Sequence, residues 1–204
     1  MIAFAEIVTE LKKVIGDRYV LTGSDTSKWS TDWTGKYLSD PIAVVRPAST
    51  VEVSAIVKLA NRLSFPVVPV SGNTGVCGGT FATDAVMVSL DRLNEFREIE
   101  PKARVAVVGA GVILSALQAK VADHDLIFPL TFGAEGSAMI GGCLATNAGG
   151  SNVLRYGNAR DLCLGIEVVR PDGEIIDVLS KLHKDNTGYS LKHLMIGSEG
   201  TLGI

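Results

Sequence analysis

Glycine is concentrated in three short stretches of this chain, and this clustering limits what the chain can fold into. Of 22 glycines, four lie between residues 72 and 79, eight between 133 and 165, and three between 197 and 203. No Gly-x-y period or Gly/Ser repeat occurs, which excludes collagen and flexible linkers. Because 47% of residues are apolar, the chain folds, and clustered glycine then marks backbone that bends sharply or approaches another group closely.

Charge and cysteine content exclude several other classes of protein. The net charge is -3 and no Lys/Arg-rich run occurs, so we expect no nucleic-acid partner. The longest charge-free run, residues 136–154, contains five glycines and two asparagines, so we expect no membrane span. Three widely spaced cysteines without a CxxC pair predict reduced thiols, a cytoplasmic location and no metal site.

Hydrophobic periodicity predicts a β–α–β unit after an N-terminal amphipathic helix and a polar stretch at residues 22–40. Two strands, 42–46 and 65–70, flank a helix that begins at the capping box Ser49–Glu52. The other expected elements are strands near 86–90, 104–109, 165–170 and 174–178, with helices over 113–124 and 189–196. We expect three parts: an N-terminal helix and wrapping segment (1–40), a first subdomain (41–95) and a second, truncated subdomain (96–204).

The first glycine stretch directly follows the second predicted strand. In α/β structures ligands bind at the carboxyl ends of parallel strands, and a glycine-rich turn there points backbone N–H groups at phosphate. The side chains of Ser71, Asn73 and Thr74 could add hydrogen bonds, while a tight structural turn is the alternative. A Walker A motif is absent. Residues 109–114 lack the third glycine of a dinucleotide-binding fingerprint, so they predict a structural turn.

The second stretch, residues 132–150, consists of small residues, hydroxyls and one amide, with almost no charge. Such a strip packs little core and lets another surface come close. That surface is either a flat ligand such as a flavin or nucleotide, or the backbone of the neighbouring subdomain.

Five motifs occur in a fixed order along the chain. They are Pro69-Val-Ser-Gly-Asn-Thr-Gly75, Ile140-Gly-Gly with Ala145-Thr-Asn-Ala-Gly-Gly150, Leu154-Arg-Tyr-Gly157, Lys184-Asp-Asn-Thr-Gly-Tyr189 and Gly197-Ser-Glu-Gly-Thr-Leu-Gly203. This order resembles the FAD-binding domain of the vanillyl-alcohol oxidase / p-cresol methylhydroxylase family, especially its D-lactate, glycolate and D-2-hydroxyglutarate dehydrogenases. The resemblance implies an α+β fold, in which a small βαβ subdomain adjoins a larger mixed or antiparallel sheet subdomain with flanking helices.

The resemblance also implies where FAD is held. The expected contacts are Pro69, Val70, Ser71, Gly72, Asn73, Thr74, Gly75, Gly78, Gly79, Gly133, Ala134, Glu135, Gly136, Ser137, Ala138, Met139, Gly142, Thr146, Asn147, Ala148, Gly149, Glu199, Gly200, Thr201, Leu202, Gly203 and Ile204. Arg155 and Arg160 either neutralise phosphate or form structural ion pairs. Relatives with a covalent flavin carry histidine where Thr74 stands, so the resemblance implies non-covalent FAD.

The activity that the resemblance implies is oxidation of a D-2-hydroxy acid to the 2-oxo acid by hydride transfer to flavin N5, with a protein or a quinone as candidate electron acceptor. The catalytic base is expected in a substrate domain beyond Ile204, so no catalytic residue is named, and His183 and His193 are interpreted as ordinary surface histidines. The alternatives are a stand-alone flavin- or nucleotide-binding module, a subunit of a larger flavoprotein complex, a UDP-sugar-linked reductase and an alkyl-transferring relative.

Overall fold

A four-stranded sheet forms the first half of the protein in the computed structural model, which describes residues 4–204. Its strands, in the order β1-β2-β4-β3, are β1 (Val20–Leu21), β2 (Ala43–Val45), β4 (Val86–Ser89) and β3 (Val67–Val70). β2, β4 and β3 are parallel, and β1 is antiparallel to β2. The side chains of β2 and β4 are fully buried, as expected for parallel strands that are covered on both faces.

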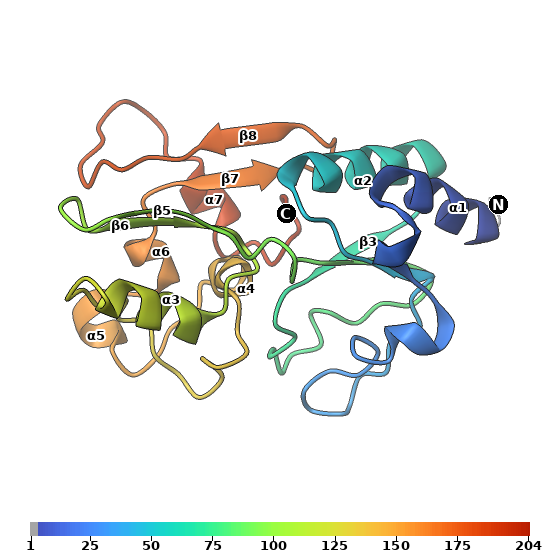
Figure 1. The fold of residues 1–204 in the computed structure, drawn as a ribbon, viewed down its shortest axis with the longest axis horizontal. Helices are drawn as coiled ribbons and strands as arrows, with labels where there is room; N and C mark the ends of the chain where they lie inside the picture. The colour runs from blue at the N-terminus through green and yellow to red at the C-terminus, as the bar shows by residue number, and fades with distance from the viewer. Residues whose placement is uncertain (1–3) are drawn as a thin grey trace.

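Two helices cover one face of this sheet, α1 (Phe4–Ile15) and α2 (Thr50–Leu63) (Figure 1). They pack on the strand residues that point to this face, with Leu11, Ile56 and Val86 fully buried together. The helix start predicted from the capping box is confirmed, because the Ser49 hydroxyl accepts a hydrogen bond from the Glu52 N–H at 3.2 Å. The Glu52 carboxylate accepts from the Ala48 N–H rather than from Ser49.

The polar stretch at residues 22–40 covers the opposite face of the sheet. The buried Trp29 packs there against Val44 and Met87, and its indole N–H donates to the Ser89 hydroxyl at 3.2 Å. Two short 3₁₀ turns, η1 (Asp17–Tyr19) and η2 (Gly23–Thr26), precede Trp29 in the chain. A helix layer and the polar stretch therefore enclose the sheet, and residues 1–3 of the expected segment 1–40 lie outside the described residues.

The second half contains two antiparallel hairpins and five short helices. The strands are β5 (Phe96–Glu100), β6 (Val105–Val108), β7 (Ile166–Val169) and β8 (Ile175–Val178). The helices are α3 (Leu114–Ala122), α4 (Ile140–Ala145), α5 (Val153–Tyr156), α6 (Ala159–Leu162) and α7 (Lys192–Met195). The predicted hairpin turn is confirmed: Gly173 has φ +83°, and its N–H donates to the Arg170 carbonyl at 2.8 Å. Among residues 4–204, no helix is long and apolar enough to span a membrane.

Helix α2 joins the two halves, because the β7–β8 hairpin lies directly against it (Figure 1). The Ser54 hydroxyl donates to the Gly173 carbonyl at 2.5 Å, and the Asn61 amide donates to the Pro171 carbonyl at 2.7 Å. Ile204 exchanges two backbone hydrogen bonds with Val169, each 2.8 Å long. The end of the chain thus lies at the junction of the two halves.

Candidate functional site

A cavity of about 580 Å³ lies between the two halves of the protein. It opens at the carboxyl end of β3, where ligands of parallel α/β sheets bind. Most of its wall is apolar. Its main lining segments are residues 69–80, 107–110, 138–148, 165–169 and 195–204. All three glycine stretches therefore contribute to one cavity.

The first glycine loop leaves its backbone donors uncommitted. Across residues 4–204, no protein group accepts a hydrogen bond from the backbone N–H groups of residues 72–80. A methyl group placed on Gly75 would meet no protein atom within 4 Å. Backbone N–H groups without protein partners are available to water or to an anionic ligand. Because these donors lie along the cavity wall, the loop is suited to bind an anionic ligand there.

The first and second glycine stretches touch each other. A Cβ on Gly72 would lie 2.2 Å from the Ser137 carbonyl oxygen, so only glycine fits there. A Cβ on Gly142 would lie 3.0 Å from the Ser71 Cβ. Of the predicted contacts in the second stretch, the cavity wall includes Ala138, Met139, Gly142, Thr146 and Ala148.

Residues 133–137 form a turn that is not part of the cavity wall, so their contact with a cofactor stays a prediction. The Glu135 carboxylate accepts a hydrogen bond from the Thr131 hydroxyl at 3.0 Å. Val70, Gly78, Asn147 and Gly149 are likewise absent from the wall. The Asn147 side-chain oxygen accepts from the Arg160 N–H at 3.0 Å, which commits it to α6.

The third stretch closes the cavity by pairing with the end of α4. The N–H groups of Gly197 and Glu199 donate to the carbonyls of Leu144 and Ala145 at 3.0 and 2.9 Å. A Cβ on Gly200 would lie 2.7 Å from Pro69 in the first loop. Of the predicted contacts, the wall includes Glu199, Gly200, Gly203 and Ile204, whereas Thr201 and Leu202 lie outside it.

Neither of the two candidate phosphate-binding arginines lines the cavity. The Arg160 guanidinium donates to the carbonyls of His193 and Ile196 at 2.7 and 2.5 Å, so it holds the end of α7. The Arg155 guanidinium lies 5.3 Å from the centre of the Tyr156 ring. A structural role for Arg160 is therefore favoured. The exposed His183 ring contacts the Ala103 carbonyl, and within residues 4–204 no group of three or more His, Cys, Asp or Glu side chains is placed to hold a metal ion.

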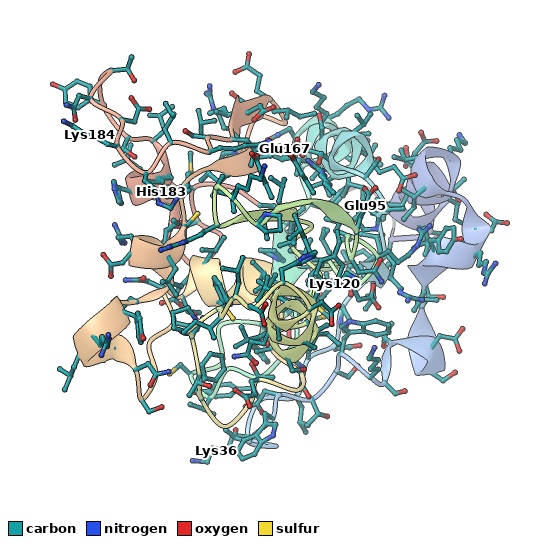
Figure 2. All side chains as sticks on the ribbon, turned by 60° about the vertical axis from the view of Figure 1, so that its left-hand side comes forward. Lys36, Glu95, Lys120, Glu167, His183 and Lys184 are labelled. Atoms are coloured by element: carbon teal, nitrogen blue, oxygen red, sulfur yellow. The ribbon has the colours of Figure 1, made fainter. Side chains whose placement is uncertain are left out.

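Sequence reasoning missed the wall that β5, β6 and β7 contribute. There, the Arg97 guanidinium lies 3.2 Å from the Glu167 carboxylate, which also accepts a hydrogen bond from the Thr50 hydroxyl. Arg97 lowers the pKa of the Glu167 carboxyl, and Glu167 raises the pKa of Arg97. Figure 2 labels Glu167 on β7. These residues lie 70 positions apart, and no local pattern in the sequence pairs them.

The cysteines differ in exposure. Cys77 is exposed on the first loop and Cys143 is buried in α4, and both are part of the cavity wall. Burial raises the pKa of the Cys143 thiol to about 11, and burial also raises that of Cys163. All three are free thiols, as the sequence predicted.

Comparison with known proteins identifies the family. Residues 41–179 match the sequence profile of a family described as an FAD binding domain. The chain belongs to this FAD-binding family. The solved structure of 4-ethylphenol oxidase from Gulosibacter chungangensis superposes on this FAD-binding domain with a TM-score of 0.79, at 26% identity, over 98% of this chain and 41% of that one. An alkyldihydroxyacetonephosphate synthase structure superposes with a TM-score of 0.85 at 22% identity, over 100% of this chain and 38% of that one. The predicted α+β fold of p-cresol methylhydroxylase type is confirmed.

Several curated relatives are named D-2-hydroxyglutarate dehydrogenases. A D-2-hydroxyglutarate dehydrogenase of Xanthomonas citri pv. viticola is 42% identical over 89% of this chain and 39% of that protein. The mitochondrial D-2-hydroxyglutarate dehydrogenase of Bos taurus is 40% identical over 95% of this chain and 36% of that protein. The FAD-binding domain described above therefore spans about two fifths of the relatives it matches.

The residues of the cavity fit the FAD that the family implies. The uncommitted N–H groups of residues 72–80 suit a pyrophosphate, which is an anion with many acceptor oxygens. The small residues of α4, including Gly141, Gly142 and Ala145, leave room along one wall for a flat ring system. The cofactor of this domain is FAD.

Proposed function

We propose that this domain is the FAD-binding part of a flavin-dependent dehydrogenase that oxidises a D-2-hydroxy acid to the corresponding 2-oxo acid. The observation that carries the proposal is the loop of residues 72–80, whose N–H groups have no protein acceptor within the part of the chain that the structure describes. The names of relatives at about 40% identity support the reaction class, with D-2-hydroxyglutarate as the first substrate to test.

The proposed FAD contacts divide by their chemistry. Residues 71–75 and Gly79 would donate backbone N–H groups to the pyrophosphate, and the Thr74 hydroxyl lies among them. Residues 138–148 would line the flavin, with Glu199–Ile204 closing the third side. Residues 133–137 are also proposed to contact FAD, although they lie outside the cavity wall. When bound, FAD supplies acceptance of a hydride at its N5 atom.

We further propose that residues 1–40, 41–95 and 96–204 act as the wrapping segment and two subdomains, with FAD between the subdomains. The groups that bind the substrate carboxylate and remove its hydroxyl proton would come from outside the cavity described above, because the wall holds one ion pair and few other charged side chains. We also propose that a protein or a quinone accepts the electrons from the flavin, and that the protein is located in the cytoplasm. Three free thiols support the location, and subcellular fractionation tests it.

Flavin attachment tests the cofactor site. Purified full-length protein should be yellow, and acid precipitation should release all of the flavin into the supernatant, because a threonine hydroxyl at position 74 provides no histidine nitrogen for a covalent link. Absorbance of supernatant and pellet at the flavin bands measures the partition. Flavin that stays in the pellet would contradict non-covalent binding.

Substrate tests address the reaction. The full-length protein should reduce an artificial dye acceptor with D-2-hydroxyglutarate, D-lactate or glycolate, and should leave the corresponding L acids unoxidised where these exist. Protein that holds FAD but oxidises none of these acids would support the alternative, a flavin-binding module or subunit without its own dehydrogenase activity.

A further inference from the structure

The first glycine loop is held by side-chain contacts within the loop and with the wrapping segment. The Asn73 amide nitrogen donates to the carbonyl of Thr31, 42 residues earlier, at 3.1 Å. The Asn73 side-chain oxygen accepts from the Thr80 hydroxyl at 2.7 Å. One amide thus ties the start of the loop both to its end and to the hairpin of residues 31–38. Figure 1 shows the two loops on the same side of the sheet.

Asn73 also sets the backbone shape of the loop. Its φ is +51°, a left-handed conformation that asparagine adopts more readily than most residues do. Both hydrogen-bonding ends of its side chain are engaged by protein groups. Its side chain is therefore committed to shaping the loop, while its N–H stays without a protein acceptor among residues 4–204.

An aromatic contact holds the far end of the loop. A Cβ on Gly78, which has φ +73°, would lie 2.7 Å from the Tyr37 ring, so the ring lies directly on the glycine. The Tyr37 and Phe81 rings lie 6.2 Å apart at 57°. Next to them, the Ala82 N–H donates to the Ser39 hydroxyl at 3.0 Å. The hairpin therefore contacts the loop at both ends, at Asn73 and at Gly78.

The hairpin is itself fixed by one carboxylate. Asp32 is 8% exposed, and its oxygens accept hydrogen bonds from the Thr34 N–H and hydroxyl and from the Tyr37 N–H, at 2.6–3.1 Å. The hydrogen bond from the Thr34 hydroxyl is the main cause that lowers the pKa of this carboxyl. The Asp32 N–H donates in turn to the Tyr37 carbonyl at 3.2 Å. A hairpin braced in this way presents Tyr37 and the Thr31 carbonyl in fixed positions.

We propose that residues 31–40 form a clamp that holds the loop of residues 72–80 in its FAD-binding shape before the cofactor arrives, with Asn73 and Tyr37 as positioning residues. The proposal rests on the proposed role of this loop in pyrophosphate binding. Because the loop N–H groups have no protein acceptors among the described residues, the contacts of the Asn73 and Tyr37 side chains add to the few contacts that fix the loop's shape. Ordering a loop in advance raises affinity by removing the entropy cost that binding would otherwise carry.

Affinity for FAD is the first test, measured by flavin fluorescence titration of flavin-stripped full-length protein. Asn73→Ala should weaken binding about tenfold, because it removes two hydrogen bonds. Tyr37→Ala should have a similar effect, and Tyr37→Phe, which keeps the ring, should bind within about twofold of wild type. Lys36→Ala is the matched control on the same hairpin, because Lys36 projects from the edge of the molecule (Figure 2) and its side chain is exposed.

Loop mobility is the second test, read from a spin label on the exposed Cys77, with Cys163 and the accessible cysteines outside residues 1–204 replaced by serine. In the absence of FAD, Asn73→Ala should narrow the lines of the electron paramagnetic resonance spectrum, because the labelled loop moves more freely. Lys36→Ala should leave the line widths unchanged. Weaker binding without greater mobility would overturn the clamp, and so would greater mobility with unchanged affinity. Wild-type protein that fails to bind FAD would instead overturn the proposed function, so the two failures are distinguishable.

Discussion

The first glycine loop and the second glycine stretch look alike in sequence, but Gly75 in the first and Gly150 in the second serve opposite purposes. In the loop of residues 72–80, backbone donors have no acceptor within residues 4–204, and Gly75 faces open space. In the second stretch, the N–H groups of Ile140 and Gly141 donate to Val112 and Ala110 at 2.9 and 2.8 Å. A Cβ on Gly150 would lie 2.0 Å from the Thr131 carbonyl oxygen. The backbone around Gly75 is free for a ligand, and Gly150 brings two protein segments together.

This difference separates stability from cofactor binding. Where glycine allows two backbones to touch, an added side chain displaces protein atoms and raises the energy of the fold. Where glycine faces the cavity, an added side chain competes only with the ligand. Substitutions in the two stretches should therefore change different measurements.

The largest effect is expected at Gly150. Gly150→Val should lower the free energy of unfolding by about 3 kcal/mol, because its Cβ would overlap the backbone of Thr131. Urea denaturation of flavin-stripped protein measures this change. A variant as stable as wild type would show that this stretch is not tightly packed, and the comparison would fail.

The opposite pattern is expected at Gly75. Gly75→Val should weaken FAD binding by about a hundredfold while the free energy of unfolding of flavin-stripped protein changes by less than about 0.5 kcal/mol. The physical reason is that the valine side chain would occupy the cavity without touching protein, since no atom lies within 4 Å of that Cβ. Titration with FAD and urea denaturation together measure the two quantities.

Gly188→Val is the matched control, because a Cβ there also meets no atom within 4 Å, but Gly188 is not part of the cavity wall. It should leave FAD affinity unchanged. Equal loss of affinity in both variants would remove the argument that Gly75 faces the cofactor.

The last test leaves the glycines unchanged and uses one cysteine from each stretch. At pH 8, Cys77 should react with iodoacetamide at least about a hundredfold faster than Cys143, because Cys143 is buried and its thiol pKa is about 11. The rate at Cys143 should rise with pH until about pH 11, since only the thiolate reacts. Peptide mass spectrometry measures both rates. Bound FAD should slow the reaction of Cys77, and an unchanged rate at Cys77 would contradict its place beside the cofactor.

The sequence predicted long and strongly patterned elements correctly and missed short ones. Helix α2 begins at its predicted cap, and β7 and β8 flank the predicted turn. Strand β1 has two residues and helices α5 and α6 have four each, and no local pattern indicated them. Helices this short are unstable alone, so contacts with the rest of the protein decide where they form.

The candidate site shows the same division. The order of motifs predicted the family that the comparisons identify, and the resemblance to that family implied that residues 69–79, 133–149 and 199–204 hold one FAD. It did not predict which glycines face the cavity, because Gly72 and Gly75 differ only in what lies opposite them. Nor did it predict that Arg160 binds the carbonyls at the end of α7.

By itself, the sequence determined the βαβ core, the glycine stretches and the FAD-binding family, because periodicity, turn residues and motif order are local properties of the chain. Tertiary structure alone decided that the Asn73 side chain contacts Thr31, that Tyr37 covers Gly78 and that Glu167 pairs with Arg97. These partners lie 41 to 70 residues apart and meet only after the sheet, the helices and the wrapping segment have packed. Hydrogen bonds and close contacts depend on distances in space, and only the packed chain sets those distances.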